Sequence, residues 1–209
     1  MIIKRTVERY LTWKELKEAV KAGTIRELVS SGDRIPVTLK TGEELELDVT
    51  FDKKGKLFFV MHDCMKEKMP MNENGKNKGG WAASDLRKKA NSTILESFPD
   101  DLQEVIAPTK IVQVIDGERI ECEDKLFCLS YTQVEGDDWL KDQEPEDSQL
   151  DIFTDMRSKV KNSDGVASTW WHRSPYALYA TTFSITNSNG GINYSYASSR
   201  HGVCLGFCI

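Results

Sequence analysis

The final segment of the chain, GVCLGFCI, places the strongest constraint on the fold. It alternates larger apolar residues with small ones, in the order Val203, Cys204, Leu205, Gly206, Phe207, Cys208 and Ile209. Because successive side chains of a β-strand point to opposite faces, the larger residues share one face and the small residues share the other. A strand without polar residues is typical of a sheet that is covered on both faces. We therefore expect a buried last strand, with the C-terminus tucked into the sheet.

The segment before this strand has an unusual composition. From Trp170 to the end of the chain there is no Lys, Asp or Glu, although charged residues make up 29% of the protein. The stretches TTFSITN and INYSYAS flank Ser188-Asn189-Gly190-Gly191, which predicts a β-hairpin. Tyr combined with Ser, Asn and Gly is typical of antibody binding loops. Composition alone fits a binding surface and an ordinary exposed hairpin about equally well.

The rest of the chain predicts an α+β protein, with helices segregated from antiparallel strands. A capping box of Thr12 and Glu15 begins a helical region over residues 12–31. Residues 34–63 then alternate apolar and polar side chains across two glycine turns, which predicts an antiparallel meander. Further helices are expected from Ser84 and from Pro99, followed by a hairpin through Asp116-Gly117 and a buried strand at 126–129.

We expect one domain over residues 1–209. Its N-terminal helices and meander occupy about 12–63, and its core occupies about 80–209. Residues 135–151 are acidic and broken by Pro145, so we interpret them as a loop insertion. An acidic loop of this kind is usually solvated. Four carboxylates here, Glu144, Glu146, Asp147 and Asp151, leave a calcium site as an alternative.

Charge and cysteine content exclude several classes of protein. A net charge of −5 argues against nonspecific nucleic-acid binding, which needs a basic face. The chain begins without the apolar run of a secretory signal, and no segment is long and apolar enough to insert into a membrane. Five cysteines without metal-ligand spacing favour reduced thiols after synthesis in the cytoplasm. Packaging into a virion stays an alternative destination.

Catalysis and metal binding have weak support in the sequence. His172 is a candidate general base for Ser174 or Cys204, but no pairing pattern accompanies it, and a His among aromatic residues is more often a packing or contact residue. Cys204 and Cys208 lie roughly 13 Å apart on a straight strand, too far for a disulfide or a shared metal. We expect two buried structural thiols, no catalytic residue, no metal and no cofactor.

Two adjacent tryptophans and an arginine form the most specific local feature. Trp170 and Trp171 point to opposite faces of an extended chain, so one can anchor the core while the other supports a surface loop. Arg173 offers a planar group of five donors, suited to loop carbonyls or a carboxylate. Pro175 fixes the turn that follows. We interpret all four as structural residues.

Several motifs follow one another along the chain: GGWAASDLR (Gly79–Arg87), LQEVIAPTKIV, DKLFCLS (Asp124–Ser130), WWHRSPY (Trp170–Tyr176) and the terminal GVCLGFCI. In this order they resemble an uncharacterised domain family that is common in gut Firmicutes and in their phages and prophages. The resemblance runs from about Thr12 to Ile209. The ending is also similar to the variable proteins of diversity-generating retroelements, in which error-prone copying at adenines diversifies a C-terminal surface.

This second resemblance implies a C-type-lectin-like fold with small antiparallel sheets, two or more helices and a C-terminal display hairpin. It implies that the display positions are His172, Leu178, Tyr179, Thr182, Ser184, Thr186, Asn187, Asn193, Tyr194, Tyr196, Ser198, Ser199, Arg200 and His201. It implies that the scaffold residues are Trp170, Trp171, Arg173, Ser174, Pro175, Gly190, Val203, Gly206 and Phe207. The sugar motifs of calcium-dependent lectins, Glu-Pro-Asn and Trp-Asn-Asp, are absent from the sequence.

We therefore expect a non-enzymatic binding protein that is encoded by a phage or prophage. Its partner would be a protein or glycan on a host cell surface, recognised by the display positions without nucleic acid or membrane insertion. One alternative is an oxidoreductase related to formylglycine-generating enzymes, which needs a reactive, exposed thiol at Cys204 or Cys208. Another is a fixed structural component of a phage tail or cell-surface assembly.

Overall fold

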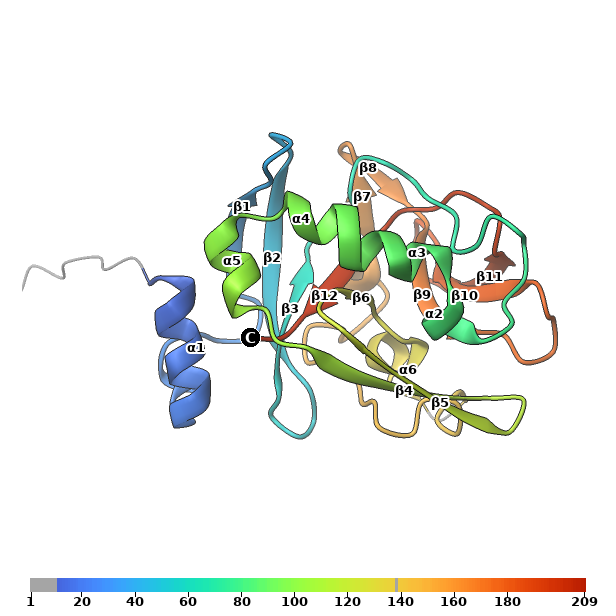
Figure 1. Ribbon diagram of the computed structural model, residues 1–209, viewed down its shortest axis with the longest axis horizontal. Helices are drawn as coiled ribbons and strands as arrows, with labels where there is room; N and C mark the ends of the chain where they lie inside the picture. Colours follow the sequence, from blue (N-terminus) through green and yellow to red (C-terminus); the bar gives the residue numbers. More distant parts are fainter. Residues whose placement is uncertain (1–10, 138) are drawn as a thin grey trace, which may run out of the picture.

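The last strand lies inside the largest sheet of the protein. We analysed a computed structural model, which describes residues 11–137 and 139–209 (Figure 1). The five strands are β1 (Arg34–Thr38), β2 (Glu44–Phe51), β3 (Leu57–Met61), β6 (Phe127–Cys128) and β12 (Leu205–Phe207). Their order is β1-β2-β3-β12-β6, and all neighbours are antiparallel. The expectation of a last strand buried on both faces is confirmed, since Leu205, Gly206 and Phe207 are all buried.

Gly206 leaves little room for a side chain at its position in the last strand. A Cβ on Gly206 would lie 3.1 Å from the Leu129 side chain and 3.4 Å from the Phe59 carbonyl oxygen. The chain end is held from the other side, because the Ala107 amide donates to the Cys208 carbonyl at 2.8 Å. The last residue, Ile209, is half-buried and packs against the hydrophobic core.

The N-terminal region packs on the same core as the last strand. Helix α1 (Trp13–Ala22) begins with the predicted capping box of Thr12 and Glu15, and a 3₁₀ turn follows at Ile25–Glu27. The Phe207 ring stacks on Phe59 of β3 at 5.3 Å between centroids, with the Trp13 ring 6.4 Å away. Residues from both ends of the sequence therefore share one hydrophobic core.

A run of short helices crosses the front of the molecule, from the small sheet near β9 to the five-stranded sheet (Figure 1). The run contains α2 (Gly80–Ala83), α3 (Asp85–Lys89), a π-helical turn (Ala90–Ile94), α4 (Leu95–Ser97) and α5 (Asp100–Val105). Ser84 caps α3, because its hydroxyl accepts from the Arg87 amide at 3.0 Å. The predicted helix from Ser84 is confirmed, and its residues Leu86, Ala90 and Ile94 are buried.

Three smaller sheets complete the α+β fold. β4 (Thr109–Ile115) and β5 (Glu118–Asp124) form the predicted hairpin, and β7 (Lys161–Ser163) pairs with β8 (Val166–Ser168). β9 (Trp170–Pro175), β10 (Thr182–Thr186) and β11 (Ile192–Tyr196) form a three-stranded sheet in which β10 is central. Among the described residues, no helix has both the length and the apolar character needed to cross a membrane.

The segment that we interpreted as a solvated acidic insertion is packed into the protein. Helix α6 (Tyr131–Glu135), with a capping box from Ser130 and Gln133, leads into it. Glu144 and Leu150 are fully buried, and the Asp151 amide donates to the Phe51 carbonyl at 2.9 Å. The expectation of solvation is therefore wrong for Leu140, Glu144 and Leu150, which are buried, whereas Asp137, Asp142, Glu146 and Asp151 are exposed as expected.

Candidate ligand-binding surface

The predicted display hairpin forms from β10 and β11. Ser184 pairs with Tyr194 and Thr182 with Tyr196, while β9 pairs with the other edge of β10. The turn between β10 and β11 depends on Gly190, which has φ +86° and is buried. A Cβ at this position would lie 1.8 Å from the Met156 carbonyl oxygen, so only glycine fits.

Four of the predicted display residues are not on the surface. His172, Thr182, Ser184 and Thr186 are buried, and this corrects their assignment as display positions. The reason is that β10 is the central strand of its sheet and is covered on both faces, with every residue from 182 to 186 buried. The polar face of β10, which alternation alone suggests to be solvated, is instead an internal polar layer.

His172 is the centre of this internal layer. Its Nδ1 lies 2.9 Å from the Ser184 hydroxyl, and its Nε2 lies 2.8 Å from the Thr186 hydroxyl. Burial, followed by the nearby positive charges of Lys159 and Arg173, lowers the pKa of His172 to about 3. The imidazole is therefore neutral at physiological pH and acts as a hydrogen-bonding core residue.

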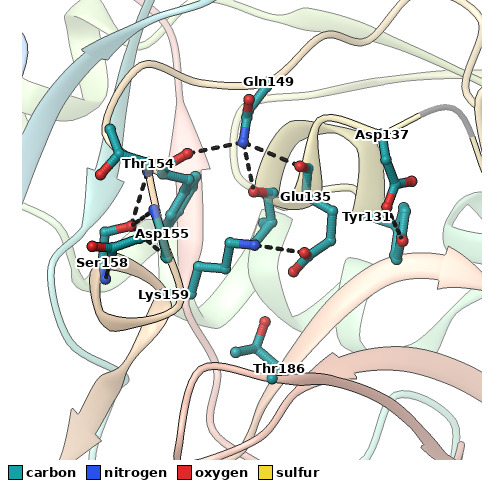
Figure 2. Close-up of polar contacts among 12 residues, drawn as sticks. Tyr131, Glu135, Asp137, Gln149, Thr154, Asp155, Ser158, Lys159 and Thr186 are labelled. Atoms are coloured by element: carbon teal, nitrogen blue, oxygen red, sulfur yellow. Dashed lines mark hydrogen bonds and ion pairs between the residues drawn. The ribbon is translucent and has the colours of Figure 1, made fainter.

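A buried ion pair covers this polar layer. Figure 2 shows Lys159 paired with Glu135 of α6, with Thr186 of β10 beneath them. Gln149 donates to the carbonyl oxygens of Val134, Glu135 and Phe153, which fixes the end of α6. This cover lies over Thr186, at the end of β10 away from Thr182.

The remaining predicted display residues have at least part of their surface in solvent. The exposed ones are Leu178, Tyr179, Asn193, Tyr196, Ser198 and Arg200. The half-buried ones are Asn187, Tyr194, Ser199 and His201. His201 is held in place, because its Nε2 lies 2.7 Å from the Ser195 hydroxyl and its ring contacts Trp171.

Five aromatic residues form one patch, which we call the aromatic surface: Trp139, Tyr176, Tyr179, Tyr194 and Tyr196. Tyr176 stacks on Tyr194 at 3.9 Å between ring centroids, and Tyr179 lies 5.5 Å from Tyr176. Trp139 contacts both Tyr176 and Tyr194, at 6.0 and 5.5 Å. Trp139, Tyr179 and Tyr196 are 54%, 62% and 65% exposed, so large rings lie in solvent on this face.

Two hollows lie beside the aromatic surface, and Tyr176 lines both. One, of about 490 Å³, is lined by Tyr176, Tyr179, Thr181, Thr182, Tyr194, Ser195 and Tyr196. The other, of about 440 Å³, is lined on one side by Pro175, Tyr176, Ala177 and Ala180, and on the other by residues of the β4–β5 turn and by Asn77. Aromatic rings beside concave polar surface are typical of ligand-binding sites.

The loop that carries Tyr176 and Tyr179 is held by one buried side chain. The Asn77 amide nitrogen donates to the carbonyl oxygens of Tyr179 and Thr182, both at 2.9 Å, and to that of Tyr176 at 3.3 Å. The Asn77 backbone amide donates to the Ala180 carbonyl at 3.0 Å. A residue about a hundred positions earlier in the sequence therefore fixes the backbone beneath the exposed rings.

The predicted scaffold residues are buried beneath this surface. Trp170 donates to the Lys159 carbonyl at 3.0 Å, and Trp171 donates to the Met69 carbonyl at 2.8 Å. The two tryptophans therefore hold two different loops from opposite faces of β9, in agreement with the interpretation of their sequence. Pro175, Gly190, Val203, Gly206 and Phe207 are buried as well.

Arg173 ties the segment 135–151 to β9. Its guanidinium donates to the Cys128 carbonyl at 2.9 Å and to the Gln133 side chain at 2.8 Å, and it forms an ion pair with Asp147. The neighbouring Ser174 hydroxyl donates to Glu144, whose pKa is raised by its burial. Arg173 therefore binds a loop carbonyl and a carboxylate, as its chemistry suggested.

The oxidoreductase alternative lacks the thiol that it requires. Cys204 and Cys208 are buried, and all five cysteines are unpaired. Burial raises the pKa of Cys204 to about 11, and its thiol donates to the Met61 carbonyl. His172 contacts neither Cys204 nor Ser174, since its two ring nitrogens bind Ser184 and Thr186.

The carboxylates of the calcium alternative bind protein groups. Glu146 pairs with Arg119 at 2.7 Å, Asp147 pairs with Arg173, and Glu144 accepts from Ser174 and from the Thr132 amide. Within residues 11–137 and 139–209, no three His, Cys, Asp or Glu side chains are grouped in a way that could hold a metal ion.

Trp139, Tyr176 and Asn77 belong to the site and were not among the predicted display residues. Tyr176 lies in the WWHRSPY motif, so its place beside the hairpin was available from the sequence. Trp139 is a single aromatic residue in an acidic segment, and Asn77 is one of several Asn residues in a polar loop. No local pattern distinguishes either residue, because their partners are distant in the sequence.

Fold and surface together define an α+β protein with several small antiparallel sheets and an exposed aromatic patch beside its C-terminal hairpin. Residues 55–209 match the family described as "Domain of unknown function (DUF6273)", and the chain belongs to this family. The match begins in the β2–β3 turn and includes the whole aromatic surface. No curated protein and no solved structure matches the chain.

Proposed function

We propose that this protein is a non-enzymatic binding module whose aromatic surface contacts a ligand. The observation that supports it is the contrast between the rings of Trp139, Tyr179 and Tyr196, which are exposed, and the buried groups that hold their backbone. Large aromatic side chains with fixed backbones dominate the energetics of many interfaces, because they bury much area at low entropy cost. The residues that the enzyme alternative would use, His172, Cys204 and Cys208, are all buried, which disfavours that alternative.

We further propose that the protein is the variable protein of a diversity-generating retroelement in a phage or prophage, on a C-type-lectin-like scaffold. The ligand is then a protein or glycan of a host surface. The C-terminal segment supports this proposal, because its exposed side chains can change without disturbing the core, whereas the buried side chains between them cannot. A fixed component of a phage tail or cell-surface assembly is the alternative, and it has the same surface without the diversity.

Deep sequencing of the gene's 3′ end across a population of the source organism tests the proposal. Substitutions templated by adenine are expected in the codons of the exposed residues Leu178, Tyr179, Asn193, Tyr196, Ser198 and Arg200. The codons of His172, Thr182, Ser184 and Thr186 are expected to stay constant, because those side chains are buried. Codons 80–130 are the internal control. If the codons of the exposed residues vary as little as codons 80–130, the result favours a fixed component of a phage tail or cell-surface assembly.

A further inference from the structure

The hollow beside the β10–β11 hairpin has an uncharged lining made of hydroxyl-bearing residues. All seven lining residues, which are Tyr176, Tyr179, Thr181, Thr182, Tyr194, Ser195 and Tyr196, carry a hydroxyl group, and none carries a charge. The volume of about 490 Å³ is within the usual range for sites that bind small molecules. The chemistry of this lining therefore favours a neutral ligand with many hydroxyl groups.

Two hydroxyl groups of the lining have no hydrogen-bond partner. The Oγ1 of Thr182 and the hydroxyl of Tyr194 are both buried and unpaired. Buried polar groups in native proteins are nearly always paired, so an unpaired one indicates a missing partner. Both residues line the same hollow, so each lies beside space that a ligand with hydroxyl groups can occupy.

The exposed rings of the hollow offer apolar contact area. Tyr179 and Tyr196 are more than half exposed, whereas Tyr176 and Tyr194 stack on each other at 3.9 Å. The C–H faces of a sugar ring pack on such aromatic faces, while the sugar hydroxyls bind hydroxyl groups at the edges. The aromatic rings of the lining match the C–H faces of a pyranose ring, and its uncharged hydroxyl groups match the hydroxyl groups of the sugar.

The neighbouring hollow shows the contrast. It is lined by the charged residues Lys78, Asp116 and Asp142 as well as by polar and aromatic ones. An anion would find no cation in the first hollow, and a calcium ion would find no carboxylate there. Charged ligands and calcium-dependent sugar binding are therefore disfavoured at the first hollow.

We propose that the hollow lined by Tyr179, Thr182, Tyr194 and Tyr196 binds a neutral carbohydrate without calcium. This rests on the proposed function, since it names the chemical class of ligand for the same surface. The Tyr179 and Tyr196 rings contact the faces of the sugar, and Thr182 and Tyr194 bind its hydroxyl groups. A longer chain can pass Tyr176 into the second hollow, where amide and carboxylate groups are available.

The test is an array of immobilised oligosaccharides probed with the purified protein in EDTA. The array holds neutral oligomers of glucose, N-acetylglucosamine, galactose and mannose beside sialylated and sulfated glycans. The expected result is binding to at least one neutral glycan, which isothermal titration then quantifies. Tyr179→Ala and Tyr196→Ala are each expected to weaken binding roughly tenfold. The control Val166→Ala, at an exposed residue of β8 that does not line the hollow, is expected to leave binding unchanged.

The melting temperature of each variant shows whether it is folded. Because Tyr179 and Tyr196 are exposed, their Ala variants are expected to melt within a few degrees of the natural protein. Binding that requires calcium, binding only to charged glycans, or binding unaffected by both Tyr variants overturns the carbohydrate proposal. If no neutral glycan binds while the exposed codons vary, the display function stands and the ligand is not a carbohydrate. If no glycan binds and the codons do not vary, both proposals are wrong.

Discussion

His172 links the stability of the protein to pH, and this link tests the internal polar layer directly. In the folded protein its pKa is lowered to about 3, mainly by burial, whereas an unfolded His has a pKa of about 6.5. Below pH 6.5 the unfolded state therefore binds a proton that the folded state does not. The contribution of His172 to the free energy of unfolding is fully present above the unfolded pKa of about 6.5. It is lost progressively as the pH falls toward 3.

The size of the effect follows from these two pKa values. Each unit of difference corresponds to about 1.4 kcal/mol, so the contribution of His172 falls by about 2 kcal/mol between pH 7 and pH 5. In His172→Gln the titrating group is gone, and this part of the pH dependence is expected to disappear. The variant is less stable at pH 7, because Gln cannot reproduce both hydrogen bonds to Ser184 and Thr186.

Urea unfolding at pH 7, 6 and 5 measures this difference in slope. Ser184→Ala is the matched control, because it removes one hydrogen bond of the same cluster and keeps the imidazole. Its free energy of unfolding is expected to fall with pH as steeply as that of the natural protein. Parallel curves for the natural protein and His172→Gln would refute a buried, neutral His172 and return that residue to the surface.

Other predictions concern the scaffold. Arg173→Met leaves the carboxylate of Asp147 without its partner, and urea unfolding is expected to show a loss of about 3 to 5 kcal/mol. Gly190→Ala clashes with the Met156 carbonyl and is expected to cost about 3 kcal/mol. The control Gly117→Ala, with open space around its Cβ, is expected to lose about 1 kcal/mol. Thiol reagents are expected to label the native protein slowly, with half-buried Cys122 first and all cysteines fast in denaturant; immediate labelling of Cys204 would contradict its burial.

Local patterns were sufficient to predict most strands and helices. The capping box at Thr12, the hairpin at Asp116-Gly117 and the alternation around Leu205 each depend on neighbours in the sequence. In each case the physical cause, such as an unpaired helix amide or a positive φ, lies within a few residues. The helices and strands of the fold could therefore be read in order along the chain.

The candidate site was predicted less completely, because its shape depends on contacts across the sequence. Thr182, Ser184 and Thr186 have the alternation of a strand with a solvated face. Only the structure shows that the pair of Lys159 and Glu135 lies over Thr186 (Figure 2). Polar residues on a strand indicate which side chains share a face, but they do not indicate whether another segment lies over it.

The segment around Trp139 shows the same limit. The acidic residues suggested a solvated loop, and Trp139 is exposed, but its ring also contacts Tyr131, Tyr176 and Tyr194. The segment returns to the core because Glu144 and Asp147 bind Ser174 and Arg173, and these pairs bridge about thirty residues of sequence. Charge density alone therefore does not predict exposure when the opposite charge lies elsewhere in the chain.

Replacing an exposed ring of the aromatic surface has a different effect from replacing a half-buried ring. Tyr179 lies on a loop whose carbonyl oxygens are held by Asn77, so its backbone does not depend on its own ring. Tyr194 stacks on Tyr176 and contacts Trp139, and its ring is part of the packing that holds the patch together. Substitution at Tyr179 therefore alters the surface alone, whereas substitution at Tyr194 alters surface and packing together. A surface that tolerates change at some rings because others are fixed can acquire a new ligand without losing its fold.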